Sequence, residues 1–248
     1  ASPEDFYGAV LEISKACPST GWVLGILGVH PWEFAQMTLE VQEEVFGDNP
    51  DTLVSSSYAP QGSAVEVDGG YRLNGEWRSS SGIPHATWSV VGAFVNRDGQ
   101  VPNLRSFLLP LNDPSIKIVD DWYTMGLSAT GSRRIVLDDV FVPRYRSIDR
   151  DMLRANAGPG LKVNTSPLYR LPQMTVYIGP GSAPAIGAAY GFLEEFKRQS
   201  AARVRRNDGT NLGQDRIVEM RVAEGGAKLR AMENTLLTAY REMYEIVC

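Results

Sequence analysis

Apolar residues recur at helical spacing through the first 47 residues of the chain. Ser2, followed by Pro3 and two acidic residues, is typical of a helix N-terminus. A second apolar segment, Trp22 to Val29, stops at Pro31, and a third short pattern, Thr38 to Phe46, ends at Gly47. The sequence therefore predicts a helical segment over residues 1–47, with its second helix ending at Pro31.

From Asp48 onward, apolar and polar residues alternate in short stretches, which is the period of a half-buried strand. The stretches are Leu53–Ser56, Ala64–Val67, Tyr71–Leu73, Trp88–Val95, Phe107–Leu111, Ile116–Val119 and Ile135–Val142. Turn signals separate them at Asp68-Gly69-Gly70, Asn74-Gly75, Asn96-Arg97-Asp98-Gly99 and Asn112-Asp113-Pro114. Short strands without helices between them predict an antiparallel β-barrel or sandwich, and we assign residues 48–150 to this β-domain.

The residue pattern changes twice in the last third of the chain. Residues 151–183 are rich in Gly, Pro, Asn and Ser and predict a long connection, whereas a helical period begins at Pro184 and continues to Cys248. Asn207-Asp208-Gly209 breaks this pattern into two helices over residues 184–248. Because a helix pair alone buries its apolar faces poorly, we expect further helices or another subunit to cover it, and a fold that continues past Cys248.

Composition excludes several classes of protein. The 248 residues carry 24 basic and 29 acidic side chains, a net charge of −5, and the basic residues are scattered, so nucleic acid is not an expected partner. The longest apolar stretch, Gly21 to Val29, is too short to span a membrane. Two cysteines without metal-ligand spacing predict a reducing cytoplasm. Two histidines, His30 and His85, leave little material for a histidine metal site or a Ser-His-Asp triad.

Two further motifs do not indicate a functional site. Gly179-Pro180-Gly181-Ser182 lacks the preceding strand of a dinucleotide-binding unit, so we interpret it as the entry to a helix. The acidic pairs Asp120-Asp121 and Asp138-Asp139 lie at strand ends without other ligands at metal spacing, and we interpret them as solvated.

Three polar features remain as candidates for a site. His30 ends an apolar helix, where a capping or core role is the ordinary alternative. Ser55-Ser56-Ser57-Tyr58 ends one predicted strand, and Ser79-Ser80-Ser81-Gly82-Ile83-Pro84-His85 ends another, although loop serines are common. Polar groups gathered at strand ends beside a helical layer can line one pocket.

These motifs together resemble those of a known family. The order of helices, β-domain and helices, with Leu73–Gly82, Met125–Ser132 and Val140-Phe141-Val142-Pro143, resembles the acyl-CoA dehydrogenase fold. The two serine runs, Gly28-Val29-His30 and Ser166-Pro167-Leu168-Tyr169 are similar to the oxygenase components of two-component, flavin-dependent phenol hydroxylases, including those acting on seco-steroid phenols and hydroxyphenylacetate. The resemblance implies an α+β fold with part of an N-terminal helical domain, a β-domain and the first two helices of a four-helix bundle.

The resemblance also implies an activity. Such oxygenases take reduced FMN or FAD from a separate flavin reductase and form a C4a-hydroperoxyflavin with O2, which hydroxylates a phenol, for example a seco-steroid phenol, ortho to its hydroxyl. The protein excludes water and orients the ring. A homotetramer is the assembly that the resemblance suggests.

Residue roles follow from the matching motifs. Ser81 matches the hydroxyl residue beside flavin N5, and His30 and Ser56 match positions that bind the phenol's polar groups, so Ser81 and His30 are the expected catalytic residues. The flavin is expected to contact Ser57, Tyr58, Ser81 and Gly82, and the substrate to contact His30, Ser56, Trp32 and His85, with Trp22 a second aromatic wall. For Trp22, Trp32 and His85, a packing or turn role is an equal alternative.

The family also uses a histidine near its C-terminus, and we expect that residue beyond Cys248. Three alternatives remain open. An acyl-CoA dehydrogenase would need a catalytic carboxylate, but no Asp or Glu occurs between Asp151 and Glu194, where one subgroup places it. A flavin-dependent amino-sugar N-oxygenase and a non-enzymatic interaction module are the others.

Overall fold

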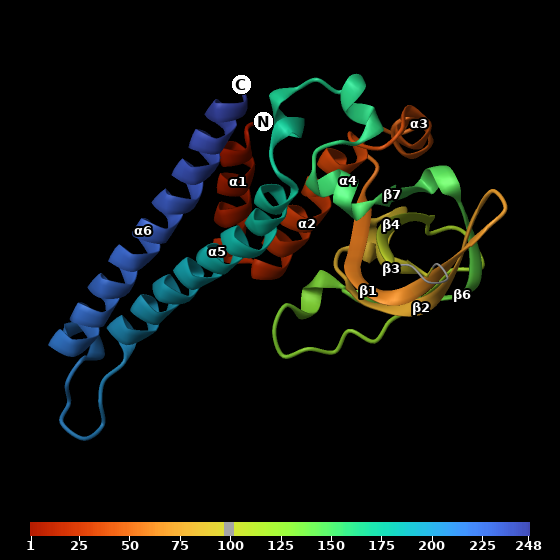
Figure 1. Ribbon diagram of the computed structural model, residues 1–248. Helices are drawn as coiled ribbons and strands as arrows, with labels where there is room; N and C mark the ends of the chain where they lie inside the picture. Colours follow the sequence, from red (N-terminus) through yellow and green to blue (C-terminus); the bar gives the residue numbers. More distant parts are fainter. Residues whose placement is uncertain (97–101) are drawn as a thin grey trace. The chain divides into compact units, whose positions relative to one another are not determined.

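The computed structural model describes residues 1–96 and 102–248, which form two compact units (Figure 1). The helical unit comprises residues 1–25 and 178–248, and the sheet unit comprises residues 26–177. The boundaries between these units fall inside two helices, whereas the four segments assigned from the sequence follow changes in residue pattern. Of the predicted turn at Asn96-Arg97-Asp98-Gly99, all but the first residue lies outside the described residues.

The first N-terminal helix begins as predicted, and the third begins and ends as predicted. Helix α1 spans Pro3–Ala16, and its N-cap Ser2 and Asp5 bond each other's backbone N–H groups in a capping box. Helix α3 spans Leu39–Phe46 between Thr38 and Gly47.

Helix α2 differs from the prediction, because it spans Pro18–Phe34 and continues past Pro31. Pro31 removes one helical hydrogen bond and is exposed, while Trp32, Glu33 and Phe34 in the next turn are buried. Burial of this turn offsets the cost of the proline, so His30 lies inside the helix instead of at its end.

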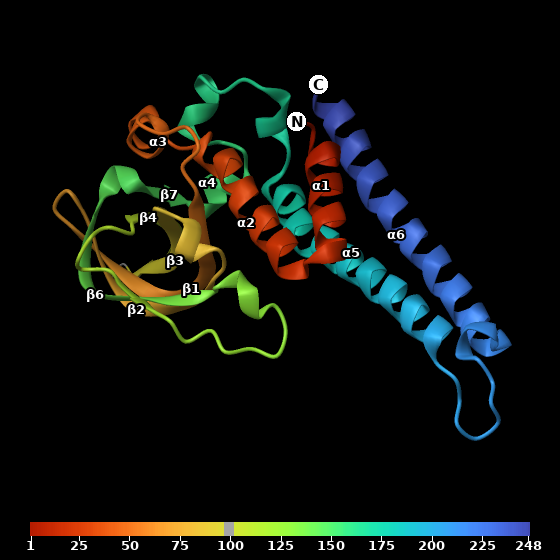
Figure 2. The ribbon, with the colours of Figure 1, turned by 180° about the vertical axis from the view of Figure 1, so that it is seen from behind.

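The sheet unit contains a strongly curved seven-stranded sheet in the order β5-β6-β2-β1-β3-β4-β7 (Figures 1 and 2). Its strands are β1 (Val54–Val67), β2 (Gly70–Ser80), β3 (Trp88–Asn96), β4 (Asn103–Pro110), β5 (Lys117–Val119), β6 (Arg133–Pro143) and β7 (Ser147–Asp149). The predicted α+β class is confirmed, with one correction to the antiparallel pairing: β1 and β3 pair in parallel. A strand that follows the β1–β2 hairpin and adds beside β1 must run parallel to it.

The turn predicted at Asn74-Gly75 is wrong, because β2 runs through both residues with an irregularity in its pairing with β6. Gly75 lies opposite Gly62 of β1, and a Cβ on Gly75 would stand 2.6 Å from the Gly62 Cα. The Asn-Gly pair therefore serves close packing between two strands instead of a chain reversal.

Both faces of the central strands are buried. On one face, Trp77, Tyr71, Phe107 and Ile135 belong to one apolar core. On the other face, Val90 and Leu108 pack with residues of α3 and of α4 (Arg150–Arg154), in a second core that also contains Phe34. Strands β3 and β4 thus contribute alternate residues to two cores.

The helix predicted from Pro184 begins earlier, since α5 spans Gln173–Ala202 and contains Pro180 and Pro184. Both prolines are buried, so packing keeps a Gly- and Pro-rich segment helical that composition alone assigns to a connection. Within residues 151–183, α4 and two short 3-10 helices, Pro159–Lys162 and Pro167–Arg170, also form.

In the helical unit, the predicted break at Asn207-Asp208-Gly209 is confirmed, because α5 ends at Ala202 and α6 spans Arg216–Val247 (Figure 1). Helix α6 packs against α1, where the Tyr7 and Tyr240 ring centroids lie 4.3 Å apart and Arg241 pairs with Glu4. Among the described residues, no helix is long and apolar enough to cross a membrane.

The buried Trp77 gives a first prediction. Its indole N–H donates to the Gly92 carbonyl at 2.6 Å in the core of the sheet unit. Trp77→Phe removes this bond and leaves unfilled volume, so we expect a loss of about 2–4 kcal/mol in the free energy of unfolding, measured with urea. The matched control is Trp122→Phe, whose indole donates to the Leu127 carbonyl near the surface and whose loss is expected to cost under about 1 kcal/mol. Equal effects of the two substitutions would contradict this assignment.

Candidate functional site

The two serine runs lie side by side in the sheet unit. Ser57 of β1 donates to the Arg78 carbonyl of β2 at 2.7 Å, and the Ser80 hydroxyl donates to that of Ser55 at 3.1 Å. Ser56 and Ser57 are nearly buried. The strand pairing thus gathers hydroxyl groups that the sequence separates by more than 20 residues.

Ser81 begins a chain of hydroxyl groups. Its Oγ lies 2.8 Å from Ser132 Oγ, which lies 2.6 Å from Thr130 Oγ1, and Thr130 donates to the Leu127 carbonyl at 2.9 Å. The Ser81 side chain is 8% exposed. This chain fixes the position of the Ser81 oxygen without placing a charge beside it. The roles of Ser132 and Thr130 were missed in the sequence, because they contact Ser81 only through pairing of distant strands.

Gly82 brings the Ser81 loop against α2. Its φ of +74° lies in the left-handed region, and a Cβ there would stand 3.0 Å from Leu27. Since Leu27 lies one helical turn before His30, the serine loop and the histidine share the same stretch of α2.

His30 is fully buried, and this burial lowers its pKa to about 3. Its Nδ1 lies 3.2 Å from the Tyr58 hydroxyl oxygen, while its Nε2 has no hydrogen-bond partner among the described residues. The imidazole is therefore neutral near pH 7, with one nitrogen engaged and the other available.

A buried carboxylate, Glu33, joins His30 to two tyrosines. The hydroxyls of Tyr58 and Tyr177 both donate to Glu33 Oε2, the second at 2.8 Å, and the two phenolic oxygens lie 2.9 Å apart. Burial, followed by the charge of Glu33, raises the pKa of both tyrosines well above the usual value. Both phenols are therefore protonated. We call His30, Glu33, Tyr58 and Tyr177 the tyrosine–glutamate network.

Sequence reasoning missed Glu33 and Tyr177 for identifiable reasons. Glu33 follows His30 by three residues, a spacing that places both on one side of a helix, but the helix was predicted to end at Pro31. Tyr177 lies in α5 before its predicted start and is 119 residues from Tyr58. Helical spacing through Pro31 was the one signal that could have found Glu33.

Arg150 and Trp32 pack around the network. The Arg150 guanidinium lies 4.8 Å from the centroid of the Tyr58 ring, and its Nε and Nη1 have no hydrogen-bond partner among the described residues. Trp32 is buried, donates to the Leu168 carbonyl at 3.2 Å and meets the Tyr177 ring edge-on. The positive charge of Arg150 faces a ring whose hydroxyl binds Glu33.

His85 and Trp22 complete the predicted site residues. His85 is exposed in the 3-10 helix Ile83–His85, and Trp22 belongs to the helical unit. Among the described residues, no three His, Cys, Asp or Glu side chains gather as a metal site.

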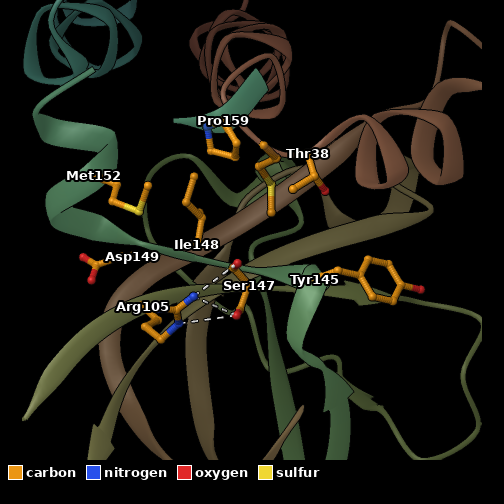
Figure 3. A pocket seen from close by; sticks show the side chains of 9 residues that line it. Thr38, Arg105, Tyr145, Ser147, Ile148, Asp149, Met152 and Pro159 are labelled. Carbon is orange, nitrogen blue, oxygen red and sulfur yellow. Dashed lines mark hydrogen bonds between the residues drawn. The ribbon is translucent and has the colours of Figure 1, made fainter. Parts of the chain in front are cut away.

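A small pocket of about 100 Å³ lies between β4, β7 and α4 (Figure 3). Arg105 crosses its floor and donates to the Ser147 hydroxyl at 3.1 Å and to its carbonyl at 3.3 Å. None of the predicted site residues lines it. Most of its other lining residues are apolar or bond within the sheet unit, while the buried Thr38 hydroxyl has no hydrogen-bond partner among the described residues, and we assign the pocket no role.

Comparison with known proteins gives consistent matches. A family model described as acyl-CoA dehydrogenase, C-terminal domain, matches residues 181–248. The chain is 41% identical over 232 residues to the flavin-dependent monooxygenase, oxygenase subunit HsaA, of Rhodococcus jostii (strain RHA1), which covers 93% of this chain and 60% of that protein. It is 36% identical to the FADH(2)-dependent resorcinol hydroxylase, oxygenase component, of Rhizobium sp. (strain MTP-10005), covering 92% of this chain and 57% of that protein.

A solved structure agrees with these relatives. The crystal structure of 3-HSA hydroxylase from Rhodococcus sp. RHA1 superposes with a TM-score of 0.91 at 38% identity, covering 100% of this chain and 62% of that one. The chain thus spans about three fifths of the length of these proteins.

The fold and the matches define the class: the chain has the acyl-CoA dehydrogenase-like fold. Within that fold it is homologous to the oxygenase subunits of flavin-dependent monooxygenases. The resemblance and the fold class predicted from the sequence motifs are therefore confirmed.

The buried neutral His30 predicts a specific acid sensitivity. Its pKa is about 3 in the folded state and near 6.5 when unfolded, so between these values the unfolded chain binds more protons, and stability falls as the pH falls. From about pH 6.5 to about pH 5 this contributes a loss of about 2 kcal/mol. We expect His30→Gln to flatten the pH dependence of urea unfolding by this amount, whereas His85→Gln, at an exposed position, leaves it unchanged. An unaltered slope in His30→Gln would show that His30 is protonated in the folded protein.

Proposed function

We propose that this protein is the oxygenase component of a two-component, flavin-dependent monooxygenase that hydroxylates a phenol ortho to its hydroxyl group. The proposal rests on one observation: neutral His30 contacts Tyr58, which lies in the same strand as Ser56 and Ser57. The chain is also homologous to such oxygenase subunits. Reduced FMN or FAD and O2 are the proposed co-substrates. A seco-steroid phenol is one candidate substrate, since a matching structure is a 3-HSA hydroxylase.

The residues proposed to hold the flavin are Ser57, Tyr58, Ser81 and Gly82. A flavin ring presents N–H and carbonyl groups, which neutral hydroxyls and backbone amides can bond without a charge. The orphaned Nε and Nη1 of Arg150, above the Tyr58 ring, are further buried donors that suit a flavin oxygen. These residues fit the group. Because the Tyr58 hydroxyl is engaged by Glu33, we propose that Tyr58 offers its ring to the flavin.

The bound reduced flavin supplies the two electrons with which O2 places one oxygen atom on the phenol and releases the other as water. Ser81, held by Ser132, is proposed to keep a hydrogen bond at flavin N5. His30 and Ser56 are proposed to bind and orient the phenol, which aligns its ortho carbon. Trp32 supports this position by packing behind Tyr177. His85 stays a weaker substrate-binding candidate because it is exposed.

The proposed activity requires a flavin reductase as partner, consistent with the description of one relative as an oxygenase component. A homotetramer is supported by exposed apolar side chains on α5 and α6, such as Phe192 at 74% and Met232 at 53%, which association would bury. The cytoplasm is supported by Cys17 and Cys248, neither of which forms a disulfide.

A single mixing experiment tests the function. The purified protein is mixed anaerobically with chemically reduced FMN, or with reduced FAD, and then with O2 and a phenol. We expect the corresponding catechol, detected by chromatography, in amounts that exceed those from flavin and O2 alone. Reduction of protein-bound FAD by an acyl-CoA thioester, without catechol formation, would instead identify an acyl-CoA dehydrogenase, and N-hydroxylation of an amino sugar would identify an N-oxygenase.

Substitution of Ser81 tests its proposed role. Without its hydrogen bond, worth about 1 kcal/mol, Ser81→Ala should lower the yield of catechol per reduced flavin about fivefold and raise hydrogen peroxide release correspondingly. The matched control is Ser106→Ala, which removes a buried hydroxyl in β4 outside the serine runs. Equal yields from Ser81→Ala and the unmodified protein would remove Ser81 from the mechanism.

A further inference from the structure

We infer that Glu33 and Tyr58 are positioning residues that fix the tautomer of His30, with the proton on Nδ1, so that Nε2 is a bare acceptor for the hydroxyl group of the substrate. The part that concerns the substrate rests on the proposed function, whereas the tautomer follows from the network alone.

The first step is a count of protons around Glu33. A carboxylate can only accept hydrogen bonds, so both tyrosine hydroxyls donate to its Oε2. Each tyrosine has a single hydroxyl proton, and Glu33 takes both. Neither proton is left for the 2.9 Å approach between the two phenolic oxygens, nor for His30.

The second step assigns the proton of the imidazole. The Tyr58 hydroxyl proton is donated to Glu33. The 3.2 Å contact between the Tyr58 oxygen and His30 Nδ1 is therefore a hydrogen bond only if Nδ1 is the donor. A neutral imidazole carries one N–H, which leaves a lone pair on Nε2. The fully buried position of His30 is consistent with the neutral form.

The third step concerns the unpartnered nitrogen. A buried acceptor without a donor destabilises the folded protein, and that cost is recovered when a ligand donates to it. His30 Nε2 has no such donor among the described residues. A phenol hydroxyl supplies this donor. When Nε2 accepts a hydrogen bond from that hydroxyl, the electron density of the phenol ring increases. The methyl ether of the same phenol has no proton to donate, so the site should discriminate between the two.

The structure also offers a matched control within the network. Tyr177 donates to the same Glu33 oxygen, but in the described contacts its hydroxyl bonds only Glu33 and Tyr58 and not the imidazole ring nitrogens. Tyr177→Phe therefore removes one hydroxyl from the network and leaves the Tyr58–His30 bond in place.

The tautomer is read by NMR on protein labelled with nitrogen-15 histidine, in which signals lost in His30→Gln assign the residue. We expect a protonated Nδ1 and an unprotonated Nε2. In Glu33→Leu the freed Tyr58 hydroxyl donates to Nδ1 and moves the proton to Nε2, and in Tyr58→Phe the preference for one tautomer is lost. Glu33→Gln, whose amide oxygen still accepts, and Tyr177→Phe should keep the original tautomer. A proton on Nε2 in the unmodified protein, or a tautomer unaffected by Tyr58→Phe, overturns the inference.

The substrate part is measured by equilibrium binding of phenol and of anisole, its methyl ether. We expect phenol to bind at least about tenfold more tightly, a preference of about 1.4 kcal/mol, and Tyr58→Phe and Glu33→Leu to reduce this ratio while Tyr177→Phe preserves it. Catechol formation by a protein whose His30 carries its proton on Nε2 would refute the tautomer and leave the proposed function standing. The expected tautomer with equal binding of phenol and anisole would refute the role of Nε2 toward the substrate.

Discussion

The burial of Glu33 is the constraint on which the polar interior of the sheet unit depends. A carboxylate removed from water must be met by donors or by positive charge, or its burial would cost several kcal/mol. Tyr58 from β1 and Tyr177 from α5 donate to its Oε2, and the charge of Arg150 lies above the Tyr58 ring, while Oε1 has no hydrogen-bond partner among the described residues. One carboxylate therefore fixes the side chains of a helix, a strand and the start of another helix, and His30 is positioned through Tyr58 as a consequence.

This arrangement requires α2 to continue past Pro31. The turn after the proline carries Trp32, Glu33 and Phe34, and each is buried for a different reason: Trp32 bonds the Leu168 carbonyl, Glu33 binds the tyrosines, and Phe34 joins the apolar core beneath α3. Three independent contacts retain a turn that proline would otherwise end. The serine loop approaches the same helix at Leu27, so α2 holds both the histidine and the neighbour of Ser81.

The sequence predicted the elements whose signals are local. The helix start at Ser2, the end of α3 at Gly47 and the break at Asn207–Gly209 each depend on a few adjacent residues, and all are confirmed. Helices α2 and α5 are longer than predicted. The prediction treated proline and glycine as helix breakers, and it could not include the burial that offsets their cost. The parallel pairing of β1 with β3 and the contacts of Glu33 with Tyr177 connect residues far apart in the chain, and periodicity carries no information on such pairs.

In the hydrogen bonds described above, Ser57, Ser81 and His30 each bond a neutral group. Glu33, the charged member of the network, has its Oε2 enclosed by two phenols, so it holds protons in fixed positions without presenting that oxygen to a ligand. His30 is buried as the neutral base, and Ser81 is held by two further hydroxyls. A charged residue in either place would attract water, and under the proposed function water at this site would favour loss of peroxide over hydroxylation. A buried carboxylate that acts through Tyr58 and His30, two residues away from the proposed substrate, can thus fix proton positions without being hydrated itself.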